Sequence, residues 1–391
     1  MTIFHFLFYA SFGILFYSYL GYGGLLWLFT RKPAQQKKQT TDEQWPAVTI
    51  IIAAFNEAAI LDQKISNTLS IDYPTHRFKI LVVTDGSTDE SATVLSRYPS
   101  VKGIHLPERK GKYAAIRHAM KEVDTPLVVF TDANTLLNPE CIKRIVPHYQ
   151  DPAVGGVAGE KKIRVDAQNS AVGQAEGRYW RYESFMKKMD ARFYTVVGAA
   201  GELFSIRTAL FRPAKEEWIL DDFMMAMHIC LQEYKMAYEP GAFATEAPSV
   251  SLAEEQKRKV RIAAGAYQAA ARLGKALNIV RHPRLAFQYF SRRILRWFFC
   301  PLALVLLLVS NIGLVWQHPD SLFFRVILLL QLFYYLLSLA GWLMLRTGKK
   351  AGLLGIPYYF LFMNSCLIKG FILYHRGKQT VLWEKAERQA N

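Results

Sequence analysis

Three short apolar runs in this sequence each end in polar residues: VTIIIAAFNE at 48–57, KILVVTDGSTD at 79–89 and PLVVFTDAN at 126–134. The apolar parts are rich in β-branched residues, which is typical of strands covered on both faces. Helical patterns separate them, and a further short strand is expected near 101–106. The helical segments run from Glu57 to about Leu69, from about Glu90 to Tyr98 and from Tyr113 to Val123. This alternation predicts βαβ units and an α/β fold with a mostly parallel, Rossmann-like sheet.

The polar residues that follow the runs are Asn56-Glu57, Asp85 to Asp89 and Asp132-Ala133-Asn134. Ligands of parallel sheets bind beyond the carboxyl ends of the strands, so these three clusters should meet at one edge. Taken alone, DGSTD is better explained as an ordinary strand-to-helix turn with a capping residue, and Asp-Ala-Asn is a weaker signal still. The convergence of the three clusters is what indicates a binding site.

The chemistry of this edge suits a nucleotide-sugar donor. Asp132 and Asn134 offer two oxygens to a hard divalent cation, Mg²⁺ or Mn²⁺, whose shell phosphate oxygens would complete. Such a cation places positive charge where the nucleoside diphosphate leaves. Lys110 and Lys112 flank a glycine before a helix and can donate to the phosphates. The sequence therefore predicts a metal-assisted donor site.

Two adjacent acids, Asp221 and Asp222, open a segment with helical apolar spacing, WILDDFMMAMHI at 218–229. Transfer with inversion needs a carboxylate that takes the proton of the acceptor hydroxyl, and either acid could serve. The alternative is helix N-capping by acidic residues, which is common. Capping does not require two adjacent acids, but the second acid is only slight evidence for a further role. We treat them as candidate catalytic residues.

Together and in this order, the motifs resemble family 2 glycosyltransferases of the GT-A type, in the membrane polysaccharide-synthase-like branch. The resemblance spans residues 47–265. The matching segments are AAFNEAAIL at 53–61, TDGSTDES at 84–91, RKGKYAAI at 109–116, FTDAN at 130–134, GAAGELFSIR at 198–207, LDDF at 220–223 and the basic stretch 257–265. It implies a GT-A glycosyltransferase domain, mostly UDP-sugar donors, and inversion that gives β-linked products.

The resemblance also implies roles for residues at the donor end. Glu57 and Asp85 would contact the nucleobase or ribose, and Lys112 the base–diphosphate end of the donor. Asp132 would be the metal ligand of a D-x-D motif. The second acid of that motif is Asn134 here, and a neutral ligand binds metal more weakly, so Asp132 would carry more of the task.

At the acceptor end, Asp222 aligns with the catalytic base of a Glu-Asp pair in which Asp221 replaces the Glu, and Gly201 would lie beneath the sugar. Processive members end the domain with Gln-x-x-Arg-Trp. Here Arg258 stands for the Gln and Ile262 for the Trp, whereas Arg261 is retained and could reach the diphosphate. An aliphatic side chain cannot stack on a sugar ring as indole does, which weakens the prediction of a growing-chain site.

Residues 3–29 contain no Lys, Arg, Asp or Glu and are long enough to cross a bilayer as a helix. A cleaved signal peptide is the alternative, but the segment lacks a basic start and precedes RKPAQQKK instead of a cleavage site. The basic residues from Arg31 onward place the following domain in the cytosol by the positive-inside rule. We therefore expect an N-terminal transmembrane helix, a linker at 30–46 and a cytosolic domain at 47–265.

Three later segments are candidates to enter the membrane: 298–316, 322–345 and a weaker one at 353–374, which is either transmembrane or re-entrant. Residues 281–297 mix basic and apolar residues at helical spacing. An interfacial helix and the start of the second span explain this stretch equally well. We expect interfacial helices over 266–297 and a multi-pass protein of the plasma (inner) membrane.

The side of the C-terminal tail, 375–391, is ambiguous. Three crossings after a cytosolic domain would leave it outside, whereas HRGKQ at 375–379 favours the inside. Trp383 and Arg388 resemble a W-x4-R element that some polysaccharide synthases place over the cytosolic active site. These observations favour a cytosolic tail.

The formal net charge is +16, from 48 Lys and Arg against 32 Asp and Glu. Nucleic-acid binding is one interpretation of such an excess. Much of it flanks the apolar segments, where it would meet anionic lipid and set topology, and a phosphate-bearing substrate would also be attracted. We therefore expect no nucleic-acid partner. The four cysteines have no metal-ligand spacing and fit a reduced, cytosolic setting.

Two versions of the function follow for the acceptor. A polymerase would extend a β-linked extracellular or cell-envelope polysaccharide and also move its product through the spans, with secretion or export proteins as candidate partners. A single-step transferase would act on a lipid-linked acceptor. The missing Gln and Trp weaken the first version, and the aromatic-rich C-terminal bundle keeps it slightly ahead. A catalytically silent nucleotide-sugar-binding regulator is disfavoured because Asp85, Asp132 and Asp222 are all present. A transporter is disfavoured because a large soluble α/β domain is expected.

Overall fold

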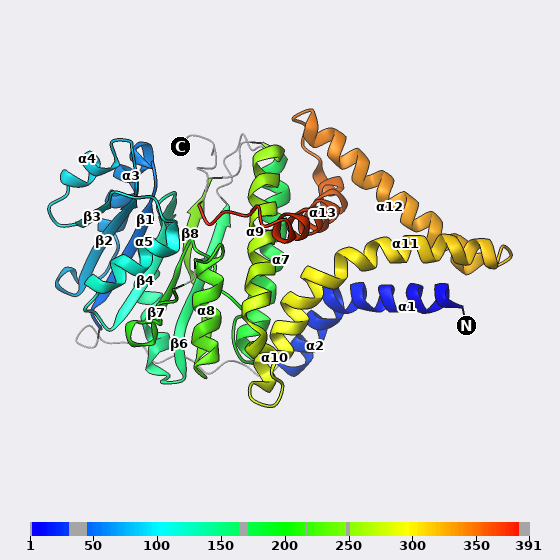
Figure 1. The fold of residues 1–391 in the computed structure, drawn as a ribbon, viewed down its shortest axis with the longest axis horizontal. Coiled ribbons are helices and arrows are strands. Elements are labelled where there is room, and N and C mark those ends of the chain that lie inside the picture. The colour runs from blue at the N-terminus through cyan, green and yellow to red at the C-terminus, as the bar shows by residue number, and fades with distance from the viewer. Residues whose placement is uncertain (1, 31–44, 164–170, 216, 248–250, 383–391) are drawn as a thin grey trace.

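The computed structural model describes residues 2–30, 45–163, 171–215, 217–247 and 251–382. Most of the expected linker at 30–46 and the expected W-x4-R element at Trp383 and Arg388 lie outside these residues. The chain divides into an α/β part built on one sheet and a group of long apolar helices (Figure 1).

The sheet has the order β3-β2-β1-β4-β7-β6-β8-β5 among the described residues. The first four of these strands are parallel, and the prediction of βαβ units is confirmed for them. Beyond β4 the sheet is mixed, because β7 runs antiparallel to both β4 and β6, and β5 antiparallel to β8. The strands are β1 (Val48–Ala54), β2 (Phe78–Asp85), β3 (Lys102–Leu106), β4 (Leu127–Asp132), β5 (Thr135–Leu137), β6 (Val154–Ile163), β7 (Phe204–Arg207) and β8 (Lys235–Glu246).

Helices cover both faces of this sheet, which explains why β1 is buried at every position and mostly apolar. Ile50 and Ile52 pack into one core with α3 (Ala58–Leu69), α4 (Ser91–Ser96) and α6 (Cys141–Ile145). Ile51, which points the other way, packs into a second core with α5 (Lys112–Ala119) and α8 (Asp221–Leu231). Successive strand residues face opposite sides, so a strand between two helix layers is expected to be mostly apolar.

Four helices are long and apolar enough to cross a membrane. The first is continuous from Ile3 to Phe29, with α1 (Ile3–Phe16) and α2 (Tyr22–Phe29) joined by a π-helical stretch, Tyr17–Gly21. The second runs from Pro283 to Gln317 and joins α10 (Pro283–Tyr289), the π-helical segment η8 (Phe290–Phe299) and α11 (Cys300–Gln317). The predicted interfacial stretch and the second span are thus one helix. The others are α12 (Leu322–Arg346) and α13 (Gly355–His375), the latter with a preceding turn.

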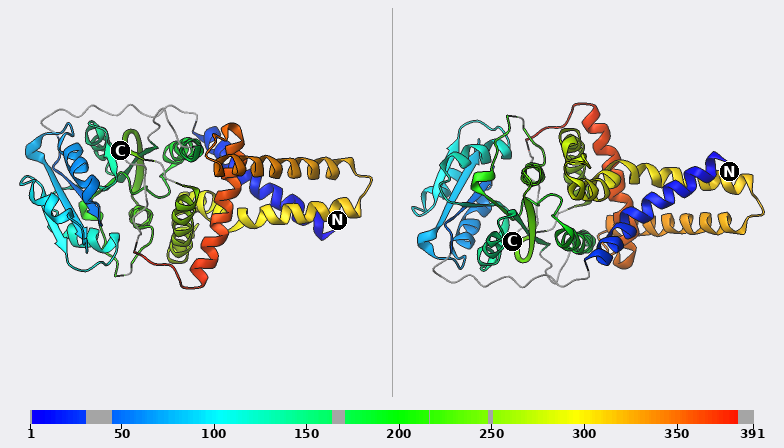
Figure 2. Two further views of the ribbon diagram at one scale, coloured as in Figure 1. Left: turned by 90° about the horizontal axis from the view of Figure 1, so that it is seen from above. Right: turned by 90° about the horizontal axis from the view of Figure 1, so that it is seen from below.

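Helices α1, α11 and α12 project together from the α/β part (Figures 1 and 2). Their outer faces carry half-exposed large apolar side chains, such as Phe12, Leu329 and Phe333. A contiguous apolar surface of this extent is normal in lipid and unusual in water. Helix α13 lies at the base of this projection, packed on α9 (Leu252–Arg272) and on α12 (Figure 2).

A buried polar cluster fastens the membrane helices to the α/β part; we call Tyr22, Glu183, Asp190 and Arg292 the junction cluster. Arg292 is 1% exposed and pairs with Glu183 at 2.7 Å and with Asp190 at 3.2 Å. The Tyr22 hydroxyl donates to Asp190 at 2.6 Å. Both carboxylates belong to α7 (Ala171–Phe193), so three segments far apart in the sequence meet here. Buried charges are tolerated when each is paired and hydrogen-bonded, as these are.

Candidate active site

The carboxyl ends of β1, β2 and β4 lie at one edge of the sheet, as expected from their parallel pairing. A continuous cavity of about 1930 Å³ opens there and extends to the membrane helices. Its sheet end is lined by predicted site residues, namely Glu57, Lys112, Asp132, Asn134, Gly201, Asp221, Asp222, Arg258 and Arg261. Nine of the eleven predicted site residues therefore share one cavity, and Asp85 and Lys110 do not line it.

Lys112 connects two of the predicted acids. Its Nζ atom lies 2.5 Å from Oδ1 of Asp132 and 3.8 Å from Oδ2 of Asp221. Burial alone would lower the pKa of Lys112, but the attraction of Asp132, Asp221 and Asp222 outweighs it and holds that pKa well above its ordinary value. The ammonium therefore stays charged at neutral pH and links Asp132, at the end of β4, to Asp221, at the start of α8.

Because Gly201 has no side chain, the ion pair of Lys112 and Asp132 can pack closely against its backbone. A Cβ atom added to Gly201 would lie 2.8 Å from Nζ of Lys112 and 3.4 Å from both carboxylate oxygens of Asp132. The backbone of the Gly201 loop thus approaches the ion pair as nearly as a glycine allows. This glycine is required by space, since its φ is not positive.

The two acids of α8 differ from ordinary exposed aspartates. Burial raises the pKa of Asp222 to about 7, and the neighbouring charge of Asp221 adds to the rise. Burial also raises the pKa of Asp221, although Lys112 opposes this. Oδ2 of Asp221 is buried and has no hydrogen-bond partner among the described residues. A pair of buried carboxyls with displaced pKa values in a cavity is typical of acid–base sites.

Asp85 and Lys110 shape the loop that precedes α5. The carboxylate of Asp85 is fully buried and accepts the backbone N–H groups of Lys110 and Gly111, both at 2.8 Å. Gly111 has φ +97°, a conformation that side-chain-bearing residues rarely adopt. The ammonium of Lys110 is mostly exposed and pairs with Glu108 at 2.7 Å. In the structure, Asp85 therefore holds the loop that presents Lys112, and the side chain of Lys110 does not line the cavity.

The residues around Asp132 suit a divalent metal that shares its shell with phosphates. Among the described residues, no three His, Cys, Asp or Glu side chains converge into an all-protein metal cage. Asp132 offers one oxygen beyond its bond to Lys112, and the unpartnered Oδ2 of Asp221 is near the same ammonium. Asn134 donates its Nδ2 to Glu246 at 3.3 Å, which leaves its carbonyl oxygen to accept. A hard cation with one or two protein oxygens fits such a donor set.

Helix α9 brings the Arg258-x-x-Arg261-Ile262 element to the cavity wall. Arg258 pairs with Glu255 on the same helix at 2.9 Å. Arg261 forms no ion pair with any described carboxylate, and the charges of Asp221 and Asp222 favour its protonated form against the effect of burial, which lowers its pKa. Of the two arginines, Arg261 has the freer guanidinium.

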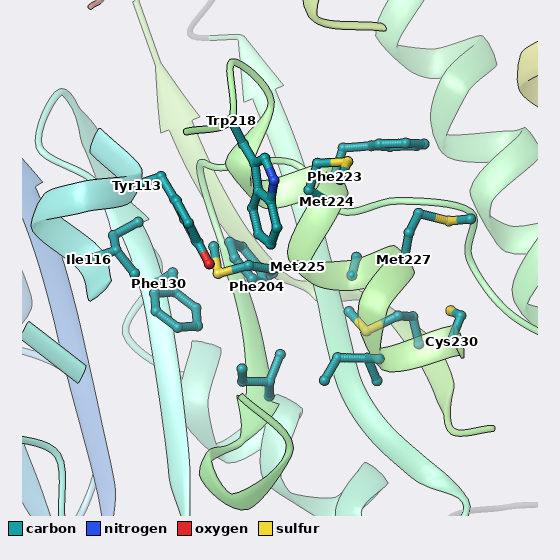
Figure 3. Packing of buried hydrophobic residues seen from close by; sticks show 14 of the residues in the cluster. Tyr113, Ile116, Phe130, Phe204, Trp218, Phe223, Met224, Met225, Met227 and Cys230 are labelled. Atoms are coloured by element: carbon teal, nitrogen blue, oxygen red, sulfur yellow. The ribbon is translucent and has the colours of Figure 1, made fainter. Parts of the chain in front are cut away.

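Several wall residues were not predicted. The ring of Trp218 stacks on Tyr113 at 4.1 Å between centroids, which joins the Lys112 loop to the Asp221-Asp222 turn (Figure 3). Tyr179 and Trp180 of α7 and Arg293 and Arg296 of η8 also line the cavity. Their spacing carried no signal, because aromatic residues in a helix indicate a core and basic residues beside a span indicate topology.

Two further features lie close to the predicted loops. Lys64 is fully buried behind Asp132, where its Nζ donates to Oγ1 of Thr131 at 2.8 Å and to the carbonyl of Thr135 at 2.7 Å. The segment after α13 also returns to the site, and the carbonyl oxygen of Val381 lies 3.4 Å from where a Cβ of Gly111 would be. Both contacts are long-range, so neither could be read from local sequence.

Comparison with known proteins gives three principal matches. Residues 49–213 match the family described as "Glycosyl transferase family 2". The poly-beta-1,6-N-acetyl-D-glucosamine synthase of Staphylococcus aureus (strain COL) is 23% identical over 260 residues, covering 63% of this chain and 61% of that protein. The beta-monoglucosyldiacylglycerol synthase of Synechocystis sp. is 27% identical over 209 residues, covering 49% of this chain and 42% of that protein. The matched region thus spans about three fifths or less of these relatives.

Among solved structures, the mannosyltransferase PcManGT from Pyrobaculum calidifontis in complex with GDP-Man and Mn²⁺ superposes with a TM-score of 0.72. The superposition covers 96% of this chain and 100% of that one, at 20% sequence identity. The likeness therefore extends over the α/β part and the long apolar helices. It confirms the GT-A-like fold.

Proposed function

Since the chain carries a family 2 glycosyltransferase domain at residues 49–213, we propose that it transfers a sugar, with inversion, from a uridine-diphosphate donor to an acceptor at the cytosolic face of the plasma membrane. One observation carries the proposal: Lys112, Asp132 and Asp221 form a single charged cluster in a cavity that reaches the membrane helices. The fold that this cluster occupies is that of a glycosyltransferase.

The donor end would work by charge. Asp132 and Asn134, with Asp221 nearby, would hold a divalent metal, which supplies positive charge to the departing diphosphate. Lys112 and Arg261 would donate to the same phosphates from fixed positions, and Arg258 lies on the same wall. Glu57 borders this end and is available to the ribose or base. Asp85 acts through the backbone of the Lys110-Gly111 loop that it holds.

The transfer step would use Asp222. Its carboxylate accepts the proton of the attacking hydroxyl while the hydroxyl oxygen bonds to the anomeric carbon and the diphosphate leaves with the bonding electrons. A pKa of about 7 suits this role, because a base works best when its pKa lies near the operating pH. Burial accounts for most of this rise, and Asp221, kept close to Lys112, would add the neighbouring charge.

Two acceptor classes have support. The Staphylococcus aureus relative is named for a β-linked glycan polymer, and the Synechocystis relative for a glycosylated diacylglycerol. A cavity of about 1930 Å³ has room for a donor and several acceptor sugars. Its extension to helices that could cross a membrane suits an acceptor presented by the bilayer, whether a glycan or a lipid. For a glycan product, export proteins are candidate partners.

The test uses membranes that contain the full chain. They are given a panel of labelled nucleotide sugars with Mn²⁺ or Mg²⁺, and products are divided into lipid-extractable, polymeric and free-sugar fractions. We expect label from a UDP-sugar in the first or second fraction. Binding of donors without any release of nucleoside diphosphate would instead favour the silent regulator, and the absence of both would end the proposal.

A further inference from the structure

The inner end of the cavity carries an uncompensated positive charge. Three arginines of η8, Arg292, Arg293 and Arg296, line the cavity. The two carboxylates beside them, Glu183 and Asp190, pair with Arg292 and Arg296. Arg293 forms no ion pair with any carboxylate in the described part of the chain. Its Nε and Nη2 donate only to the backbone carbonyl of Val197, at 3.2 and 2.9 Å.

Arg293 lies next to the reaction centre. Its guanidinium is over the ring of Phe223, 5.6 Å from the centroid, and Phe223 directly follows the proposed base Asp222. Val197 precedes the Gly198–Gly201 loop, whose residues line the same cavity. The side chain is only partly buried, so its remaining N–H groups are accessible from the cavity. A cation with spare donors in a partly desolvated pocket favours an anion with several acceptor oxygens.

The same cavity opens toward the region where lipid would lie. Leu20 of the first apolar helix and Ile356 of α13 line it and are also 66% and 52% exposed. Phe360 and Met363 continue this apolar lining inward, and Tyr19 packs on Phe360 at 4.8 Å between ring centroids. The cavity therefore has a mouth on this side that is formed by helices apolar enough to enter a membrane. Acyl or prenyl chains suit such a mouth, and a free sugar does not.

Resting on the proposed function, we infer that the acceptor is a phosphate-bearing lipid. Its phosphate binds Arg293, its chains leave the cavity between Leu20 and Ile356, and a hydroxyl beyond the phosphate faces Asp222. That hydroxyl forms the bond to the anomeric carbon, its proton goes to Asp222, and the nucleoside diphosphate leaves with the electron pair. The order of groups along the cavity, apolar then cationic then acidic, matches the order of groups along such a lipid.

The test compares acceptors with the full chain in vesicles of neutral phosphatidylcholine and a saturating donor. The vesicles contain a phospholipid with a free headgroup hydroxyl, a polyprenyl-diphosphate-linked sugar or neutral diacylglycerol; a parallel reaction contains soluble oligosaccharide with inorganic phosphate. We expect label in one of the two phosphate-bearing lipids, and which one identifies the source. Equal or better transfer to diacylglycerol or to the soluble oligosaccharide would overturn the inference while leaving glycosyl transfer intact.

Variants of η8 and α10 sharpen the result. Arg293→Gln should raise the KM for the phosphate-bearing lipid by about tenfold or more, the low end for losing a hydrogen bond to a charged group. Arg293→Lys should restore part of this loss because the charge returns. Arg284→Gln removes the same charge from an exposed position of the same continuous helix, and its KM should match the parent. An unchanged KM in Arg293→Gln would exclude the phosphate site.

Loss of the Val197 contact is the main confounding effect of these variants. Thermal unfolding and donor binding by calorimetry are measured on each of them. If Arg293→Gln does not fold, competition in the parent protein decides: a non-reactive phosphate lipid should inhibit transfer, and its dephosphorylated analogue should not. Equal inhibition by both lipids would contradict the inference. Failure to release nucleoside diphosphate with every donor and acceptor would instead contradict the proposed function.

Discussion

Nζ of Lys112 lies 2.5 Å from Oδ1 of Asp132, so the carboxylate that we propose as a metal ligand is bound on one side by an ammonium. The second acid in reach of that ammonium, Asp221, lies 3.8 Å away and begins the helix that carries the proposed base. One lysine therefore sets the positions of the donor end and the acid–base end together. A substitution at the donor end should therefore alter the geometry of the acid–base end, and the reverse.

Replacing Asp222 by Asn removes the proposed base and keeps its size. The rate at saturating donor should fall by at least about a hundredfold, the low end for a general base, while donor affinity survives. Steady-state transfer and calorimetric donor binding measure the two quantities. Asp124→Asn is the control and should behave as the parent, because Asp124 belongs to an exposed ion pair with Lys79 and does not line the cavity. Near-normal turnover in Asp222→Asn would remove the base from this position.

The pH dependence follows from the raised pKa of Asp222. Because that pKa is about 7, the carboxyl is protonated and inactive as a base below pH 7 and ionised above it. The value of kcat/KM should therefore rise with pH, with a slope of one on a logarithmic plot, and level off above about 7. Asp221→Asn removes a neighbouring negative charge, so its rising limb should move to lower pH. If the rising part of the pH–rate curve stays at the same pH in Asp221→Asn, the pH dependence does not come from the Asp221–Asp222 pair.

Gly201→Ala tests the close approach beneath the ion pair. The added methyl would lie 2.8 Å from Nζ of Lys112, and either the lysine or the loop must move. We expect kcat/KM to fall by about ten- to a hundredfold, since small misplacements of charged groups have effects of that size. Gly24→Ala is the matched control, because nothing lies within 4 Å of its new methyl. Equal activities of the two variants would argue against the tight packing.

Removal of divalent metal should stop the reaction. Excess chelator is expected to abolish transfer, and added Mn²⁺ or Mg²⁺ to restore it, because the leaving diphosphate then regains its positive partner. Initial rates against free metal concentration give the requirement. Transfer that persists in excess chelator would show that Lys112 and Arg261 suffice, and Asp132 would lose its proposed role.

Lys64→Met removes the buried amino group behind Asp132 while keeping a side chain of similar volume; burial lowers the pKa of that amino group to about 7. Thr131 and the Thr135 carbonyl, which bracket Asp132, would lose their shared donor. The metal concentration for half-maximal rate should rise about tenfold, the low end for a residue that orients a ligand. A titration of rate against Mn²⁺ measures it. If only thermal stability changes, Lys64 serves the core and not the loop.

A substantial part of the fold could be predicted from local pattern. Strands that are buried on both faces consist mostly of apolar residues, so β1, β2 and β4 were found to within one or two residues. The mixed half was missed. β6 (VGGVAGEKKI) and β8 carry glycines and charges that hide their strand character, and Lys161 within β6 is buried only because Glu202 and Glu246 neutralise it. Such pairing is a tertiary fact that no window of sequence contains.

For the site, too, residues with a local sequence signal could be predicted and residues that depend on long-range contacts could not. Sheet topology brings together residues that follow strand ends, so the convergence of Glu57, Asp132 and Asn134 on one cavity followed from the parallel pattern. Trp218, Lys64 and Arg293 were not singled out, because each acts through a contact with a residue 60 or more positions away. A basic residue beside an apolar segment is interpreted by topology rules alone. Only the structure distinguishes Arg293, which faces the cavity unpaired, from Arg292, which is neutralised in the junction cluster.

The junction cluster also has a consequence for how the protein is made. Tyr22 leaves the ribosome first and Asp190 long after it, but Arg292 follows Asp190 by a further 102 residues. Until that arginine is synthesised, Glu183 and Asp190 lack the cation that makes their burial favourable. We therefore expect α7 to pack stably against the first apolar helix only after the helix that carries Arg292 has been synthesised. In a chain truncated before Arg292, we expect α7 to remain unpacked from the first apolar helix.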